Sequence, residues 1–287
     1  MKYADADFDP YVLSKPAAGA IPLVCDSPHS GVIYPRDFGS CLPPAILRSG
    51  EDTYVEELWR AIPAAGGSLV AANFPRTYID PNRELADIDA TMLDGPWPTE
   101  LHPSEKTRLG TGLIWRLARK QAMYARKLSV TEVENRIRRF HQPYHAALSA
   151  QIEEAYAKFG GVWHLNLHSM PTNSYELLEI KTDRQLADFV LGDHDGRTCA
   201  PALVDTIEAF LSGRGYVVTR NDPFKGVALI ARIGRPAENR HSLQIEVNRK
   251  LYMDEESYAK SPGFGALQES LSLLSAHLAK FVGSQLA

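Results

Sequence analysis

The segment that most constrains how this chain folds runs from Gly161 to Pro171, with the sequence GVWHLNLHSMP. It holds a short apolar run that is rich in residues favouring β-structure and too short for an ordinary helix. We therefore expect a buried strand that ends at His168. In open α/β sheets, ligands bind beyond the carboxyl ends of the strands. His168 is thus placed for catalysis or metal binding, with a hydrogen-bonded structural histidine as the alternative.

A second apolar run, from Ile21 to Cys25, leads directly into a loop that contains His29. We expect this run to form another strand, because it stops at a Ser-Pro-His-Ser-Gly sequence typical of a turn. His29 is then a second histidine at a strand end, and its structural alternative is a residue that caps its own loop.

The segment from Pro43 to Ile62 has the periodicity of a helix and contains two acidic residues that are candidate metal ligands. Apolar residues recur there at three- and four-residue spacing, which predicts a helix with one buried face. Asp52 and Glu56 would share a face one turn apart. Either can be a metal ligand or a solvated side chain, and a carboxylate at Asp52 would also complement the helix dipole.

Two arginines surround a predicted turn. A strand is expected at Ser68 to Ala72 and an extended segment at Arg76 to Ile79, before the turn Asp80-Pro-Asn-Arg83. Because no acidic run neutralises them, Arg76 and Arg83 are candidates to clamp an anionic substrate, although surface arginines are common.

The middle of the chain is predicted to be a long loop followed by helices. Residues 84–112 show no clean period. Helices are expected at Leu117 to Leu128 and from Thr131 to about Phe140, the second begun by a capping box of Thr131 and Glu134. A further amphipathic helix is predicted from Tyr144 to Phe159.

His141 and His145 have the four-residue spacing of a helical metal pair. Pro143 lies between them and belongs in the first turn of the next helix, since a proline inside a helix breaks it. The two histidines therefore need not share a face, and we rank them below His29 and His168.

The last predicted strand, Ser242 to Val247, carries a glutamate inside an apolar alternation. A buried charge at such a place is costly unless it has a catalytic role or is paired with another charge. Glu246 is therefore the leading candidate for a functional carboxylate. Around this strand we expect a helix at Pro201 to Leu211, strands at Tyr216 to Thr219 and Val227 to Ala231, and a closing helix from about Ser257 to Val282.

Composition narrows the class of protein. The apolar fraction of 44% and charged fraction of 23% indicate a globular protein, and the net charge of -4 gives no reason to expect nucleic acid as a partner. We find no signal peptide, no membrane-spanning run and no disulfide pattern, so we expect a cytoplasmic protein. We expect residues 1–287 to form one α/β domain of three layers, with a central mixed, mainly parallel sheet. The oligomeric state is not indicated.

The candidate residues together form the inventory of a catalytic zinc site: two histidines at strand ends, an acidic residue near a helix start and a buried strand carboxylate. Such sites hold the metal with three protein ligands and keep one position for water. A carboxylate that is not a ligand then acts as general base.

The motifs resemble those of the N-formylglutamate amidohydrolase family and follow the family's order over nearly the whole chain. The matching segments are Ser27-Pro-His-Ser-Gly31, Asp52 with Val55 and Leu58, Arg76 with Asp80-Pro-Asn-Arg83, Gly112-Leu-Ile-Trp115, Pro143-Tyr-His145, Leu167-His-Ser-Met170, Asn221-Asp-Pro-Phe-Lys-Gly226 and Leu243-Gln-Ile-Glu-Val-Asn-Arg249 with Leu251-Tyr-Met253.

This resemblance implies a fold similar to that of zinc carboxypeptidases and aspartoacylase, and it implies roles for single residues. Zn²⁺ or another divalent transition metal would bind His29, Asp52 and His168, and Glu246 would be the general base. Arg83 would act on the reacting group and bind substrate. The other implied substrate-binding residues are Arg76, Asn82, His145 and Asn221.

The chain departs from the family pattern at several positions. The usual second ligand, three residues after the first histidine, is replaced by Val32, so the acidic ligand becomes Asp52 or Glu56. Asn166 stands where related chains often carry Asp, which leaves the support of His168 open. Val227 follows Gly226 in place of a second glycine, and residues 192–196 form an altered loop.

The activity that the resemblance implies is hydrolysis of N-formyl-L-glutamate to L-glutamate and formate, a step of histidine degradation, with a small N-acyl amino acid as the binding partner. One alternative is a metal amidase that acts on another N-acyl amino acid or a small peptide. Another is a non-catalytic binding protein that has kept the fold.

Overall fold

The structure is a computed structural model that describes residues 2–5, 7–16 and 19–286. The chain divides into two compact units, each built from three stretches of sequence. The first unit holds residues up to Val12, Pro28–Thr53 and Val70–Ser149; the second holds Leu13–Ser27, Tyr54–Leu69 and the chain from Ala150 onward. None of the helices among the described residues is long and apolar enough to cross a membrane.

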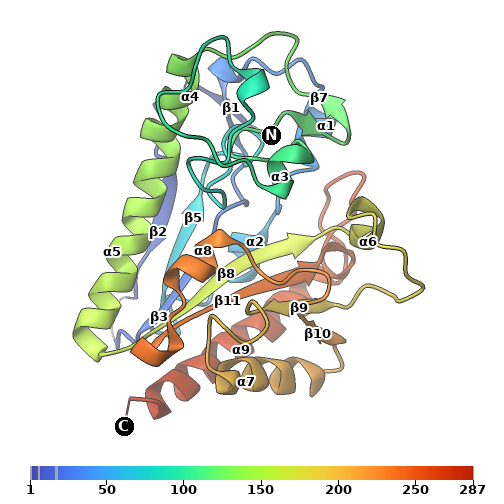
Figure 1. Cartoon of the computed structure of the whole chain (residues 1–287). Coiled ribbons are helices and arrows are strands. Elements are labelled where there is room, and N and C mark those ends of the chain that lie inside the picture. Colours follow the sequence, from blue (N-terminus) through green and yellow to red (C-terminus); the bar gives the residue numbers. More distant parts are fainter. Residues whose placement is uncertain (1, 6, 17–18, 287) are drawn as a thin grey trace. The chain divides into compact units, whose positions relative to one another are not determined.

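The principal sheet is mixed and mainly parallel, with the strand order β10-β9-β11-β8-β3-β5-β2 (Figure 1). Both β3 and β11 pair with β8 in parallel, β10 pairs with β9 in parallel, and β11 pairs with β9 in antiparallel fashion. The predicted α/β fold with a mainly parallel sheet is confirmed. The strands are β2 (Tyr11–Ser14), β3 (Leu23–Ser27), β5 (Ser68–Ala72), β8 (Val162–Met170), β9 (Phe189–Gly192), β10 (Val218–Arg220) and β11 (Arg240–Asn248).

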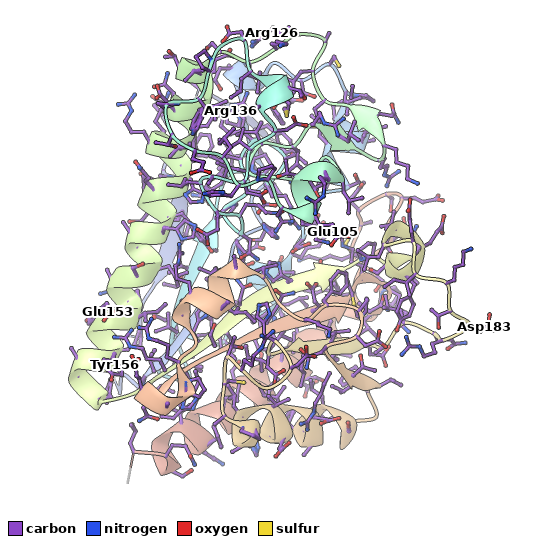
Figure 2. The ribbon with its side chains drawn as sticks, viewed as in Figure 1. Glu105, Arg126, Arg136, Glu153, Tyr156 and Asp183 are labelled. Atoms are coloured by element: carbon purple, nitrogen blue, oxygen red, sulfur yellow. The ribbon has the colours of Figure 1, made fainter. Side chains whose placement is uncertain are left out.

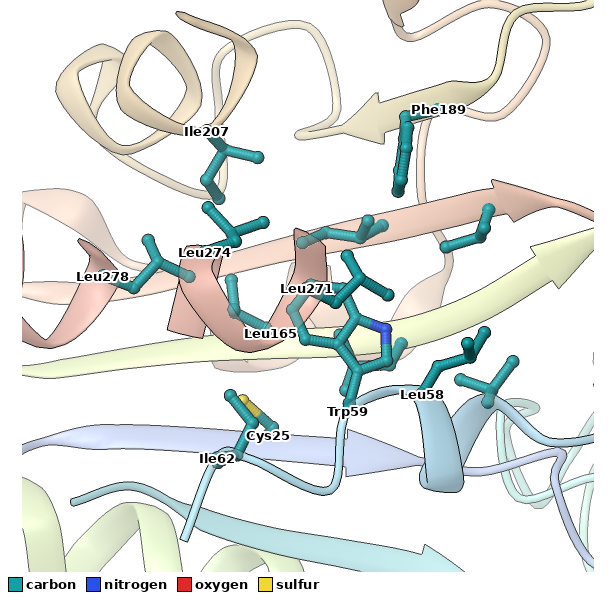
Figure 3. Close-up of a cluster of buried hydrophobic side chains, with 14 of the residues drawn as sticks. Cys25, Leu58, Trp59, Ile62, Leu165, Phe189, Ile207, Leu271, Leu274 and Leu278 are labelled. Atoms are coloured by element: carbon teal, nitrogen blue, oxygen red, sulfur yellow. The ribbon is translucent and has the colours of Figure 1, made fainter. Parts of the chain in front are cut away.

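The core of the second unit covers one face of β3, β8 and β11. Side chains alternate along a strand, so the apolar residues of β8 that lie two apart, such as Leu165 and Leu167, all reach this face. Helices α2 (Val55–Leu58), α7 (Pro201–Ser212) and α9 (Phe264–Ser284) pack onto it. Figure 3 shows Leu271 and Leu274 of α9 with Trp59 and Leu165 in this core. Each such side chain contributes about 1.5–3 kcal/mol by leaving water.

The C-terminal part of α5 (Gln142–Phe159) covers the other face of β3. Val24 of β3 and residues of α5 line a cavity of about 150 Å³. Leu23 and Cys25, on either side of Val24 in the strand, belong to the apolar core instead, so Val24 and α5 lie on the opposite face of β3. Glu153 and Tyr156, labelled on α5 in Figure 2, fix Arg240 at the start of β11. Its guanidinium donates to both Glu153 oxygens at 2.7 Å and lies 3.9 Å from the Tyr156 ring centroid.

The first unit contains short elements joined by long loops. A buried arginine lies among them: Arg136 donates to the carbonyl oxygens of Tyr78 and Phe38 and to the Tyr124 hydroxyl, and its guanidinium lies 4.2 Å from the Tyr78 ring centroid (Figure 2). Carbonyls and aromatic faces thus stabilise this buried charge. The elements are β1 (Lys2–Ala4), paired in parallel with β4 (Ile33–Pro35), α1 (Pro44–Arg48), α3 (Glu105–Arg108), the hairpin of β6 (Leu117–Ala118) and β7 (Gln121–Ala122), and α4 (Val130–Arg136).

The predicted helix from Pro43 to Ile62 is wrong, because α1 and α2 are separated by a loop that contains Asp52. Tyr54 has a φ of 69°, which a continuous helix does not accommodate. The backbone N–H of Asp52 donates to the carbonyl of His29 instead of to a helical partner. The expected burial is nevertheless confirmed, since Val55, Leu58, Trp59 and Ile62 are all buried.

Two further segments differ from their predicted conformation in the first unit. Arg76 to Tyr78 form a turn, closed by the Tyr78 N–H on the Pro75 carbonyl, and are not extended. Residues 117–128 contain a hairpin in place of a helix. Arg119 and Lys120, at its tip, have φ values of 47° and 61°, as a type I′ turn requires.

The capping box is real but lies two residues earlier than predicted. Ser129 and Glu132 cap α4 reciprocally, whereas Thr131 and Glu134 do not. A π-helical turn (Ile137–His141) then leads into α5, where Pro143 occupies the first turn as predicted.

In the second unit, the segment predicted as a strand at Val227 to Ala231 is instead helix α8 (Ala228–Ile233). An apolar run this short does not distinguish a strand from a buried helix. Helix α9 begins at Phe264, later than predicted, since Tyr258 has a φ of 57° and Pro262 follows it. The other short helix of this unit is α6 (Ser174–Leu177).

Candidate active site

His29 lies in the loop after β3, and its ring is held between two carboxylates. Its Nε2 lies 2.8 Å from Asp80 Oδ1, and its Nδ1 lies 3.4 Å from Asp52 Oδ2. The Asp80 carboxylate accepts from Nε2, so a His29 ring with one proton carries it there and directs the Nδ1 lone pair toward Asp52. Two electron-pair donors this close suit a shared cation.

Gly31 lies in the loop around His29, at a position where a larger residue would not fit. A Cβ at this position would lie 2.1 Å from the carbonyl oxygen of Phe74. The loop therefore packs directly onto the backbone that follows β5, and only glycine permits that approach.

Asp80, which we did not single out as a site residue, is the centre of this part of the site. Oδ1 faces His29 and also accepts from the backbone N–H of Asn82 at 2.9 Å. Oδ2 accepts from the Arg76 guanidinium, at 3.1 Å from Nε and 2.8 Å from the terminal nitrogen, and from Trp115 Nε1 at 3.3 Å. Burial alone would raise the pKa of this carboxyl, but Arg76, Arg83 and His29 hold it well below its ordinary value. Asp80 therefore stays ionised.

Both arginines predicted to clamp a substrate are tied to this loop. The Arg83 side chain is 9% exposed, donates from Nε to the Thr111 carbonyl at 3.0 Å, and has a terminal nitrogen 3.9 Å from Asp80 Oδ2. Burial lowers the pKa of Arg83, and Asp80 opposes that shift. No acidic run lies beside the pair, as the sequence predicted, but the single carboxylate of Asp80 lies beside both guanidinium groups.

His141 and His145 support the same loop from α5 and the turn before it. The Nε2 of His145 donates to the Pro81 carbonyl at 2.7 Å, and the Nε2 of His141 donates to the Arg83 carbonyl at 3.1 Å. Their ring centroids are 4.2 Å apart. Both contacts fix the backbone on either side of Asn82, and both Nε2 atoms are used for this purpose.

In the second unit, strand pairing brings His168 and Glu246 side by side. The register of β8 and β11 aligns Glu246 with His168, Gln244 with Asn166 and Ser242 with His164. Paired residues of parallel strands point to the same face, so these six side chains line the face opposite the apolar core. Glu246 is buried and accepts a hydrogen bond from Gln244 Nε2 at 2.8 Å.

The ring of His168 is oriented by Asn166, the residue two positions before it. The Asn166 amide nitrogen donates to Asp26 Oδ1 at 2.8 Å, so its oxygen is the atom that faces His168 Nε2 at 2.7 Å. An amide oxygen only accepts, so Nε2 of His168 carries the proton and Nδ1 keeps the lone pair. The support of His168 is therefore supplied by the Asn166 side chain.

Asn221 and Glu56 lie elsewhere in the second unit. The amide of Asn221, after β10, accepts from the Asp193 N–H at 3.0 Å and donates to the Asp193 carboxylate at 2.7 Å, which shapes the altered loop at 192–196. Glu56 lies in α2, whereas Asp52 contacts His29 within the first unit. The contact with His29 favours Asp52 over Glu56 as the acidic candidate.

Sequence reasoning missed Asp80 and Asp26 as site residues. Both acidic residues stand next to segments that we did single out, Asp80 at the start of the Asp-Pro-Asn-Arg turn and Asp26 just before the Ser-Pro-His-Ser-Gly loop. An aspartate at the edge of a predicted buried strand was the signal for Asp26.

A family model described as N-formylglutamate amidohydrolase matches residues 21–253. The chain belongs to this family. An N-formylglutamate amidohydrolase from Ralstonia eutropha JMP134, known from its crystal structure, is 58% identical to the chain, with a TM-score of 0.96 over 97% of this chain and all of that one. The N-formylglutamate deformylases of Pseudomonas aeruginosa and Pseudomonas putida are each 26% identical over 243 residues, which cover 83% of this chain and 85% and 84% of theirs.

A more distant solved structure, a gene product of Agrobacterium tumefaciens, shares the fold with a TM-score of 0.60 at 19% identity, over 99% of this chain and 97% of that one. Membership in the N-formylglutamate amidohydrolase family confirms the resemblance that the motifs predicted. The region matched by the family model contains every one of the candidate site residues.

Proposed function

We propose that this chain is a metal-dependent amidohydrolase that cleaves the formamide bond of N-formyl-L-glutamate and yields L-glutamate and formate. The observation that carries this proposal is the family match over residues 21–253, supported by the 58% identical N-formylglutamate amidohydrolase. The side chains of the candidate active site supply the chemistry that such a reaction needs.

The proposed metal ligands are His29, Asp52 and His168, one nitrogen or oxygen atom each. The donor chemistry of each unit fits this role. Each histidine has its Nε2 held by an oxygen, Asp80 for His29 and Asn166 for His168, so Nδ1 is the atom that offers a lone pair. Zn²⁺ accepts such a set of two imidazoles and one carboxylate. When bound, the metal ion polarises the formyl carbonyl and makes water a stronger nucleophile near neutral pH.

Glu246 is the proposed general base and acid. Its place beside His168 in the strand register puts a carboxylate next to one of the proposed ligands. In the proposed reaction, Glu246 takes a proton from the attacking water and the carbon–oxygen bond forms. Glu246 then returns the proton to the nitrogen as the carbon–nitrogen bond breaks, so one carboxylate serves both steps.

Arg83, Asn82 and Arg76 are proposed to bind the carboxylates of the substrate or the oxygen that becomes negative during attack. His145 would act from behind this loop through Pro81, and Asn221 would shape the loop at 192–196. The fixed backbone around Asn82 and the charge on Arg83 support this assignment, because a rigid loop places a cation without a large entropic cost.

The test is formate release from N-formyl-L-glutamate by the protein loaded with Zn²⁺, repeated after chelation and after Zn²⁺ is restored. We expect release that chelation abolishes and Zn²⁺ restores. N-acetyl-L-glutamate and N-formimidoyl-L-glutamate serve as comparison substrates under the same conditions. Hydrolysis of one of these in place of the formyl compound, or no hydrolysis by folded, metal-loaded protein, would refute the proposed substrate.

A further inference from the structure

A chain of buried hydrogen bonds crosses three strands of the second unit and ends on His168. It joins Ser242 of β11, His164 and Asn166 of β8, and Asp26 of β3. The His164 ring lies 2.7 Å from Ser242 Oγ and 2.9 Å from Asp26 Oδ1. All four residues are 0% exposed, so these contacts form without competition from water.

Each hydrogen bond in this chain has a definite direction. The Asp26 carboxylate only accepts, so Nε2 of a neutral His164 donates to it and Ser242 donates to Nδ1. The Asn166 amide donates to the same carboxylate and accepts from His168. The negative charge of Asp26 thus polarises the amide of Asn166, which makes its oxygen a stronger acceptor for His168.

We infer that Asp26 is a positioning residue for His168. Acting through Asn166, it orients and polarises the ring as a carboxylate hydrogen-bonded directly to His168 would. Asn166 transmits its charge and orients the ring. This inference rests on the proposed role of His168 as a metal ligand. A carboxylate behind a ligating histidine fixes the tautomer and makes the imidazole a better donor to the metal, and its loss typically weakens metal binding by about 10–100-fold. Asp26 and Asn166 therefore act as one unit.

The pair can be tested by exchanging the two side chains. Asp26→Asn removes the charge and leaves two amides. Asn166→Asp places two carboxylates at hydrogen-bonding distance in a buried site, where both cannot easily be ionised. The double variant D26N/N166D restores one carboxylate and one amide, now with the carboxylate directly against His168. In this double variant the new amide nitrogen at position 26 would donate to His164 Nε2 and to the new carboxylate at position 166, and His164 would donate from Nδ1 to Ser242 Oγ.

The measurement is the Zn²⁺ dissociation constant of the apoprotein, obtained by competition with a chromophoric chelator in the absence of substrate. We expect each single variant to bind Zn²⁺ about 10–100-fold more weakly and the double variant to return to within a few-fold of the parent. Cys25→Ala is the matched control, because Cys25 precedes Asp26 on β3 but faces the apolar core, and its Zn²⁺ affinity should not change.

Circular dichroism and thermal unfolding of the metal-free variants establish that each is folded. If Asp26→Asn does not fold, the comparison of Asn166→Asp with the double variant decides. Parent-like affinity in Asp26→Asn, or a double variant no better than the single variants, would overturn the inference. Since no substrate is present, failure to hydrolyse N-formyl-L-glutamate would not be mistaken for failure of this inference.

Discussion

The two units hold their candidate site residues in different ways. In the first unit, His29, Asp52, Asp80 and Arg83 stand on loops, and each is held by several polar contacts. In the second unit, strands carry His168 and Glu246, and the ladder of backbone hydrogen bonds sets their spacing. A strand fixes the direction of its side chains by its period of two, whereas a loop needs a separate interaction for each one. The stability of the loop part should therefore be more sensitive to loss of a single charge than the stability of the strand part.

The largest effect should come from the strand part. Glu246→Gln keeps the size of the side chain and a partner for Gln244 but removes the base, so we expect kcat for formate release to fall by about 10²–10⁴-fold. Stability and Zn²⁺ affinity should stay close to those of the parent. Glu256→Gln, at an exposed position in the same unit, is the control. Turnover by Glu246→Gln within a few-fold of the parent would exclude its role as base.

In the loop part, Asp80→Asn should reduce stability more than the loss of any other single charge from the site. Arg76 and Arg83 would lose their shared carboxylate, and breaking a buried ion pair on one side costs about 3–5 kcal/mol. Urea unfolding of the metal-free protein measures this loss. Asp94→Asn, at an exposed aspartate of the same unit, should change the unfolding free energy little. An equally small change in Asp80→Asn would show that the loop does not depend on this charge.

A moderate effect on substrate binding is expected from His145, which supports the loop that carries Asn82 and Arg83. His145→Ala removes the donor to the Pro81 carbonyl, and a hydrogen bond of this kind contributes about 1 kcal/mol. Because the backbone next to Asn82 and Arg83 loses a fixed point, KM for N-formyl-L-glutamate should rise several-fold with a smaller change in kcat. His145→Gln keeps a donor and should recover part of the loss. A fall in kcat alone would point to a different role.

The smallest effect concerns a surface contact of the first unit. The Arg126 guanidinium, together with the N–H and hydroxyl of Ser129, lowers the pKa of Glu132 from 4.5 to about 2. A carboxyl whose pKa is lower in the folded state stabilises the protein above its unfolded pKa, and this contribution is lost as the pH falls from about 4.5 towards 2. The unfolding free energy of Glu132→Gln should thus depend less on pH in that range than that of the parent. Parallel pH profiles would contradict this.

The same contrast explains what the sequence could predict. The strands that carry His168 and Glu246 are predictable, because buried parallel strands are continuous apolar runs in which a polar residue stands out. The loop containing Asp52 resembles a helix in sequence, since its flanking apolar residues are spaced as in a helix and nothing in the sequence shows the positive φ of Tyr54.

The interactions of Asp80 were even harder to predict from the sequence. Its partners Arg76, His29 and Trp115 come together through turns whose geometry no periodicity encodes. Similarly, Asp26 contacts residues more than a hundred positions away, and only the strand register reveals them. Local patterns therefore predicted the strands β3, β5, β8 and β11 and several helices, and the family motifs supplied the roles of residues on loops.

The pairing of β3 with β8 has a consequence for the order of events during synthesis. Asp26 and His164 are 138 positions apart, so β3 leaves the ribosome long before its partner strand exists. Closing so long a segment is slow, since its entropic cost precedes any reward from contacts. Until β8 arrives, Asp26 lacks the His164 and Asn166 side chains that donate to it in the folded protein. A nascent chain that ends before residue 162 therefore holds the first histidine of the site but lacks the strand that pairs with β3 beside Asp26.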